Sequence, residues 1–410
     1  MKSGSFAHDA IRSIRVLVLL VLCTCATYEV ALAQTSPNST DDLAKTREMM
    51  GRIFQSVSVV LPLSLSPTKF EEVANREVIT KALKDLSENA AGLEMHGKGK
   101  DQSFAFMSKS LAFDTKEIYQ RFQQGKFNQA RYLVQHVTEN CIACHTRLPS
   151  KDSPRAEKFF ETIDIATLSL PEKARLQTAL RQFENAMTSY EQILLSKSQS
   201  SDEIGLADVP VDYLVVAVRV RYDLKRASET LEKFRQRGDL PLYLQHNVEQ
   251  WSDSLKSLAK AKPKGTPIAQ ARSLIETGKH LMQFPVDRQA MVYNLVASSV
   301  LHRFLETQPA PPAKASAEAY YLLGLSESLT ARSFWVSPTA TYLESSIRMD
   351  PHGPFSHRAY ELLEESIIFE YSGSSGVHLP GDVEQKLIEL RQLMDKRSVS
   401  SKAPAKEKKK

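Results

Sequence analysis

The chain has 410 residues, of which 42% are hydrophobic and 25% are charged, and its formal net charge is +5. This length predicts two or three domains with enough apolar residues to form cores. Much of the positive excess lies in the lysines between Lys402 and Lys410, so we expect no nucleic-acid partner. Residues 398–410 are predicted to be a disordered basic tail, with docking onto an acidic partner or anionic lipid as the alternative.

Residues 1–33 have the pattern of a secretory signal peptide. A basic start is followed by an apolar stretch from Val16 to Ala26 and by the A-x-A cleavage pattern at Ala31-Leu32-Ala33. The apolar stretch is short for a membrane span, and an uncleaved anchor is the alternative. Cys23 and Cys25 lie in this segment, so its cleavage leaves two cysteines in the mature chain. We therefore expect a periplasmic protein with no membrane span in the mature chain.

Four helices are predicted between residues 41 and 150, because apolar residues recur there at steps of three and four. The predicted helices cover about 41–62, 70–97, 103–125 and 128–149. Short loops joining helices of similar length favour an up-down-up-down four-helix bundle.

The fourth predicted helix contains Cys141-Ile142-Ala143-Cys144-His145, which has the C-x-x-C-H pattern of c-type haem attachment. Two thiols three residues apart lie on one helical face, so both can bond to the vinyl groups of one porphyrin. His145 then supplies the proximal imidazole for the iron. A reducible disulfide and a structural zinc site are the alternatives. They lack, respectively, a neighbouring βαβ pattern and a second pair of Cys or His ligands.

With this motif at the end of a fourth helix, residues 41–150 resemble the cytochrome c prime and cytochrome c-556 family. The resemblance covers about a quarter of the chain. It rests on the position of the motif and the number of helices, with Cys141, Cys144 and His145 as the specific residues. It implies a four-helix bundle that carries one covalently attached haem c.

The resemblance also suggests a sixth ligand for the iron. In six-coordinate members of the family, a methionine on the first helix is the second axial ligand, which implies Met50, on the apolar face, ahead of Met49. Met95 and His96 are further candidates. Without any such ligand the iron is five-coordinate and binds small gases.

Helical patterns separated by proline or glycine continue from residue 156 to residue 397. The predicted spans are 156–168, 172–196, 211–236, 241–259, 268–282, 287–307, 314–330, 339–349, 356–370 and 382–396. Repeating helix pairs predict an α-solenoid, because each pair has an apolar face that its neighbours cover. The loop 371–378 is expected to be a flexible turn between helices.

One helix pair in this array resembles a tetratricopeptide repeat. Tyr320-Tyr321-Leu322-Leu323-Gly324 follows the W-x-x-L-G element, with tyrosine in place of tryptophan. Leu343 and Ser346 fall at the packing positions of the second helix. Glu327 departs from the pattern, since an aromatic residue is expected there.

These features together predict an all-α, exported monohaem c-type cytochrome that is not an enzyme, since no catalytic constellation accompanies the motif. The expected function is electron transfer with a redox partner protein that docks on the array. Two alternatives remain open: a five-coordinate haem sensor for gases, and an interaction scaffold with an accessory haem.

Overall fold

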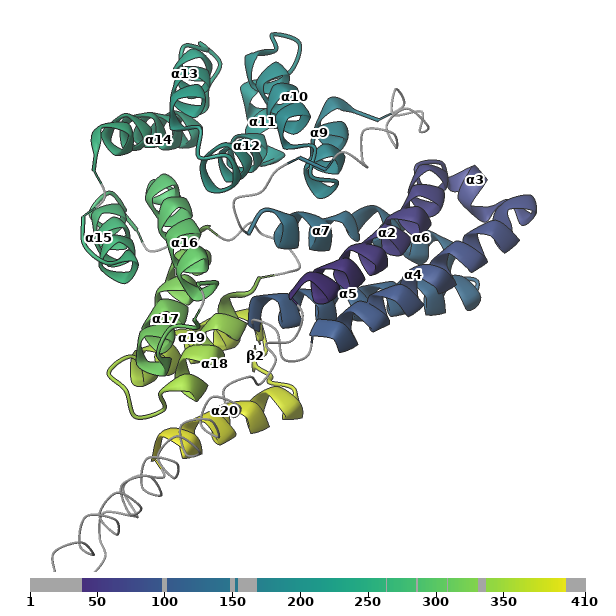
Figure 1. Cartoon of the computed structure of the whole chain (residues 1–410). Helices are drawn as coiled ribbons and strands as arrows, with labels where there is room; N and C mark the ends of the chain where they lie inside the picture. The colour runs from purple at the N-terminus through teal and green to yellow at the C-terminus, as the bar shows by residue number, and fades with distance from the viewer. Residues whose placement is uncertain are drawn as a thin grey trace, which may run out of the picture. The chain divides into compact units, whose positions relative to one another are not determined.

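The computed structural model describes residues 39–97, 102–147, 152–153, 168–262, 264–284, 287–307, 309–330 and 337–395. The chain divides after Gly51 into two parts, each described by itself. The fold is all-α, as predicted, with helices forming nearly all the secondary structure of the described residues (Figure 1). None of the helices in these ranges has the length and apolar character needed to cross a membrane. The predicted signal peptide and the basic tail lie outside the described residues.

The described residues before 148 form seven helical segments. They are α2 (Ser39–Ser64), α3 (Pro67–Glu71), the 3₁₀ helix η1 (Val73–Asn75), α4 (Arg76–Gly97), α5 (Gln102–Gln123), α6 (Phe127–His136) and α7 (Thr138–His145). Helix α4 packs against α5, and α5 in turn contacts α6 and α7. The second predicted helix was expected to begin near residue 70. It begins at Arg76 as α4, after the short helix α3 and the 3₁₀ helix η1.

Helices α4 and α5 form where their apolar periodicity predicted them. The apolar side chains that α4 buries include Ile79, Leu83, Leu86, Ala90 and Leu93. They follow one another at steps of three and four, as expected for a helix with one face in the core. After α5, Gly125 has a φ of +75°, a left-handed conformation that glycine adopts without steric cost.

The fourth predicted helix is interrupted at Val137, so the single helix expected over 128–149 is wrong in this respect. The backbone N–H of Asn140 donates to the Val137 carbonyl at 3.2 Å, a tighter turn than that of an α-helix. Consecutive β-branched residues, Val137 and Thr138, lower the helix propensity at this point. Helix α7 ends at His145, and the predicted end at Pro149 lies outside the described residues.

The other helices of the described ranges lie in the region predicted to form the array, which is called the array below. They are α9 (Leu170–Ala179), α10 (Phe183–Leu195), α11 (Ser201–Leu206), α12 (Val209–Leu214), the π-helix η3 (Val215–Val220), α13 (Leu224–Arg235), α14 (Leu242–Lys260), α15 (Pro267–Lys279), α16 (Met291–Leu305), α17 (Ala313–Thr330), α18 (Thr339–Met349), α19 (Ser356–Glu370) and α20 (Gly381–Asp395). From α14 onward the observed bounds agree with the predicted spans to within about four residues. The predicted span 156–168 lies almost wholly outside the described residues.

Two predicted helices of the array are divided. The span 172–196 contains α9 and α10, and the span 211–236 contains α12, η3 and α13. Arg181 and Tyr222, with φ of +59° and +54°, lie at these divisions. Left-handed backbone ends a helix, and it is uncommon in residues other than glycine. The sequence therefore carried no clear signal of either break.

The loop 371–378 contains a minimal hairpin, in place of the flexible turn that was expected. Strand β1 (Ser372–Gly373) pairs antiparallel with β2 (Gly376–Val377). Gly376 has a φ of +108°, which is open to glycine but strained for other residues.

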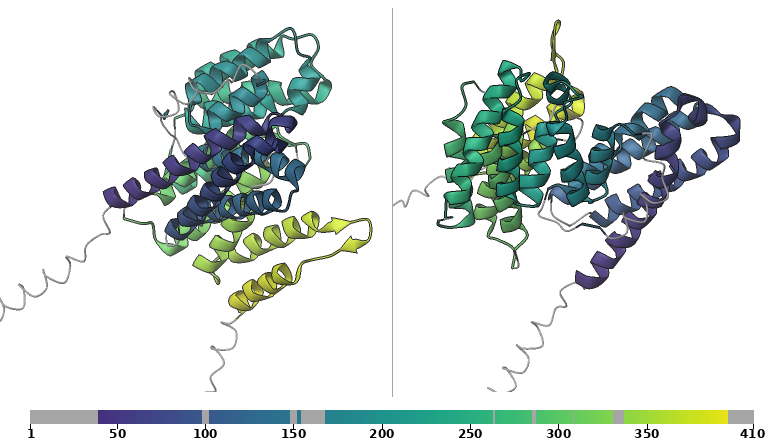
Figure 2. Two further views of the ribbon diagram at one scale, coloured as in Figure 1. Left: turned by 90° about the vertical axis from the view of Figure 1, so that its right-hand side faces the viewer. Right: turned by 90° about the horizontal axis from the view of Figure 1, so that it is seen from above.

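Neighbouring helices of the array pack side by side (Figure 2). Helix α13 packs against α14, α15 against α16, and α17 against α18. In the last pair a Cβ atom built on Gly324 would lie 2.5 Å from Cδ2 of Leu343, so glycine permits this close approach. Leu343 and Ser346 are buried, as predicted, and the Ser346 hydroxyl donates to the Ala317 carbonyl at 2.7 Å.

Candidate functional site

Helix α7 carries the C-x-x-C-H motif. Cys141 and Cys144 are free thiols, and both are half-buried, as is His145. The Cys141 thiol lies 3.9 Å from the Val137 carbonyl oxygen. Burial raises the pKa of Cys141 to about 12, and the neighbouring Cys144 and Glu139 raise it further. The Cys141 thiol is therefore protonated at neutral pH, and Cys144 lies one helical turn further along α7.

His145 is held by a hydrogen bond from a different helix. Its Nδ1 atom lies 2.7 Å from the carbonyl oxygen of Ala179, at the end of α9. A carbonyl oxygen only accepts, so Nδ1 carries the proton and Nε2 keeps its lone pair. Burial lowers the pKa of His145 to about 4, despite the hydrogen bond to Ala179, and the charge of Arg181 lowers it further. The imidazole is therefore neutral, and Nε2 is the nitrogen suited to bind a metal.

The C-terminus of α9 leaves the Ala179 carbonyl free for this role. The Gln182 N–H donates to the Gln177 carbonyl at 2.8 Å, and the Arg181 N–H donates to the Thr178 carbonyl at 3.0 Å. This is a Schellman motif, with Arg181 as its left-handed residue. It uses the two preceding carbonyls, while the carbonyl of Ala179 lacks a helical partner. His145 satisfies it.

A second contact between α7 and α9 lies one helical turn before Ala179. Arg175 Nη2 is 2.5 Å from Oε1 of Glu139, two residues before Cys141. Arg175 Nε is 3.7 Å from Oδ2 of Asp212, a carboxylate of α12 that is almost fully buried. One guanidinium therefore joins the helix of the motif to two helices of the array.

The end of α7 contacts the array at a third point. Arg147, two residues after the motif, is buried and forms an ion pair with Glu306, with Nη2 and Oε1 3.2 Å apart. Glu306 follows α16 in the chain. The residues after the motif are thus fixed by a charge-assisted hydrogen bond.

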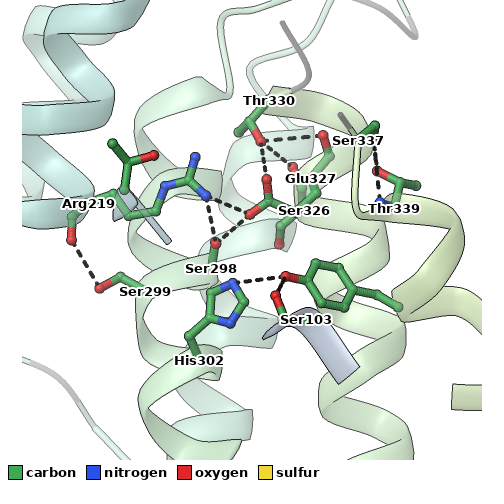
Figure 3. Close-up of polar contacts among 12 residues, drawn as sticks. Ser103, Arg219, Ser298, Ser299, His302, Ser326, Glu327, Thr330, Ser337 and Thr339 are labelled. Carbon is green, nitrogen blue, oxygen red and sulfur yellow. Dashed lines mark hydrogen bonds and ion pairs between the residues drawn. The ribbon is translucent and has the colours of Figure 1, made fainter. Parts of the chain in front are cut away.

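A buried polar cluster lies between α5 and the array (Figure 3). The Ser103 hydroxyl is 2.6 Å from the hydroxyl of Tyr342, which is 3.5 Å from His302 Nε2. Nearby, Arg219 Nη1 lies 2.8 Å from Oε1 of Glu327. Glu327, which departs from the tetratricopeptide pattern, is therefore the partner of a buried arginine. These contacts join side chains of the core to one another, so the cluster is structural in its chemistry.

The candidates for the sixth ligand lie in different places. Met49 and Met50 are half-buried in the first part of the chain, on α2. Met95 is 67% exposed near the end of α4, and His96 beside it is half-buried. The choice among these four residues stays a prediction.

The chemistry of the motif fits a covalently attached haem. Two thiols share one helical face, and the next residue is a neutral imidazole whose Nδ1 donates to a backbone carbonyl, which leaves the lone pair on Nε2. Nδ1 bonded to a backbone carbonyl is the usual arrangement of a histidine that ligates a metal. Within the described ranges, no group of three or more His, Cys, Asp or Glu side chains comes together as a metal site.

The sequence predicted Cys141, Cys144 and His145, and the structure brings them together at the end of one helix. The sequence did not predict the contacts of Ala179 and Arg175 with α7. A backbone carbonyl has no sequence signature, and arginine is a common residue on exposed helix surfaces. The capping box at Ser169 and Glu172 is a sequence signal that places the start of α9. Comparisons of the chain with protein-family models, curated proteins and solved structures found no match.

Proposed function

We propose that this protein is an exported monohaem c-type cytochrome that transfers electrons to a redox partner protein. Haem c is attached at Cys141 and Cys144, and His145 is an axial ligand of its iron. The proposal includes a cytochrome c prime-like bundle over residues 41–150 and a tetratricopeptide-like array over 156–397, which docks the partner. Bound haem supplies a one-electron Fe(III)/Fe(II) couple.

The observation that carries the proposal is the hydrogen bond from His145 Nδ1 to the Ala179 carbonyl. It selects the tautomer in which Nε2 is free, orients the ring and raises the basicity of the ligating nitrogen. A neutral imidazole with its proton on Nδ1 keeps its lone pair on Nε2, which is the form that binds a metal.

The cysteines supply the attachment. Each thiol adds across one vinyl group, so sulfur bonds to one carbon, hydrogen goes to the other, and no net oxidation occurs. Because the two thiols lie three residues apart on α7, both would be available to hold one porphyrin. His145, the next residue, would bind its iron.

Haem staining of denaturing gels tests the proposal. The full chain, exported from a bacterial host able to attach haem, should keep peroxidase-active stain after denaturation, and Cys141→Ala with Cys144→Ala should abolish it. Cys23→Ala with Cys25→Ala is the matched control, because these cysteines lie in the predicted signal peptide. Stain that persists in the first variant, or a wild-type chain without stain, contradicts the proposal.

A further inference from the structure

The helix that accepts the His145 hydrogen bond belongs to the array, so its position relative to α7 determines the strength of that bond. Two polar contacts join α9 to α7: the bond from His145 to Ala179 and the ion pair of Arg175 with Glu139. Arg175 and Ala179 are four residues apart, so they lie on the same face of α9. A shift of α9 at Arg175 is therefore transmitted to the carbonyl of Ala179.

Arg175 also lies close to a carboxylate of the array, that of Asp212. Asp212 lies in the first turn of α12, where the helix dipole favours a carboxylate, and its side chain is only 2% exposed. A buried carboxylate needs a cation close by, and Arg175 Nε lies 3.7 Å from it. The guanidinium thus connects α12 to Glu139 on α7.

Open space borders this ion pair on one side. A cavity of about 220 Å³ lies beside Arg175 and Glu139, and its walls also include Leu61, Gln135 and Leu176. Atoms that face a cavity lose van der Waals contacts on that side. On this side, the ion pair of Arg175 with Glu139 is the polar contact that joins α7 to α9.

We infer that Arg175 is a positioning residue for the haem ligand, through which the array adjusts the donor strength of His145 and so the reduction potential. This inference rests on the proposed function. A firm bond from Nδ1 to Ala179 makes the imidazole a stronger donor and stabilises the oxidised iron. Loosening α9 weakens the bond and favours the reduced iron.

The test uses the purified, haem-loaded full chain and two readouts other than electron-transfer activity. These are the midpoint potential and the iron–histidine stretching frequency in resonance Raman spectra of the reduced protein. Arg175→Met should shift the potential to more positive values and the stretching band to lower frequency. Arg226→Met is the matched control, because Arg226 joins Glu191 of α10 to α13 at 2.7 Å with similar exposure, away from α7.

Arg175→Met removes the guanidinium that lies 3.7 Å from the buried carboxylate of Asp212, so the same substitution is also made together with Asp212→Asn, which removes the buried charge. Glu139→Gln changes only the α7 side of the ion pair, and it should shift the midpoint potential and the stretching frequency in the same directions by smaller amounts. If both other variants fail to fold, this variant decides the question. Unchanged potential and band in folded variants, or equal shifts in Arg226→Met, overturn the inference. Absence of covalent haem in every protein, wild type included, contradicts the proposed function instead.

Discussion

His145 Nδ1 and the carbonyl oxygen of Ala179 are 2.7 Å apart, although the two residues are separated by 34 positions and belong to different helices. The predicted haem ligand on α7 is therefore oriented by α9, the first described helix of the array. Arg147 and Glu306 repeat this relationship at the end of the motif. The array supports the candidate site directly, in addition to any role in binding a partner.

Met50 is the first residue to substitute in identifying the sixth ligand. If Met50 ligates the iron, Met50→Ala should convert a low-spin absorption spectrum to a high-spin one, because a vacant or water-filled position has a weaker ligand field. Met49→Ala and Met95→Ala are matched controls that should leave the spectrum unchanged. A wild-type spectrum that is already high-spin, and whose Soret band shifts with carbon monoxide, would instead support the gas-binding alternative.

Arg219 and Glu327 form a buried ion pair, and breaking it should destabilise the array. Arg219→Met leaves the carboxylate of Glu327 buried without its cation, which should cost about 3–5 kcal/mol of unfolding free energy in urea titrations. The double variant Arg219→Met with Glu327→Leu removes both charges and should recover most of that loss. A double variant no more stable than Arg219→Met would show that the pair is not the source of the effect.

His302 should make the stability of the protein depend on pH. Burial lowers the pKa of His302 well below its ordinary value, and the charges of Arg147 and Arg219 lower it further. The unfolded chain therefore binds a proton near pH 6.5 that the folded chain does not. Stability is full above that pH and falls as the pH decreases below it.

The contribution of His302 is measured as the change in urea midpoint between pH 7.5 and pH 5 (about one unit either side of the ordinary histidine pKa). His302→Gln should reduce this change, since glutamine keeps a polar group near Tyr342 but does not titrate. His280→Gln is the control at an exposed histidine and should leave the change as in the wild type. Equal slopes in all three proteins would refute the prediction.

Gly324 should not tolerate a larger side chain. A Cβ atom there would lie 2.5 Å from Cδ2 of Leu343, so Gly324→Ala should separate α17 from α18 and cost about 1–3 kcal/mol. Gly238→Ala is the matched control, because no atom lies within 4 Å of a Cβ built at that turn. Thermal unfolding of both variants measures the difference, and equal melting temperatures would argue against the close approach.

The sequence by itself determined the features that depend on neighbouring residues. The spans 314–330, 339–349 and 356–370 agree closely with α17, α18 and α19, because apolar spacing and helix breakers act within a few turns. The motif from Cys141 to His145 is equally local, since three-residue spacing already places both thiols on one helical face.

Tertiary structure alone decided what surrounds that motif. The partners of His145 and Arg147 lie 34 and 159 residues away, so no local pattern indicates them. The end of α9 depends on a left-handed arginine rather than a glycine, and it is this ending that frees the Ala179 carbonyl. Such contacts arise only when helices pack, because packing brings distant polar groups within hydrogen-bonding distance and removes the water that would otherwise compete for them.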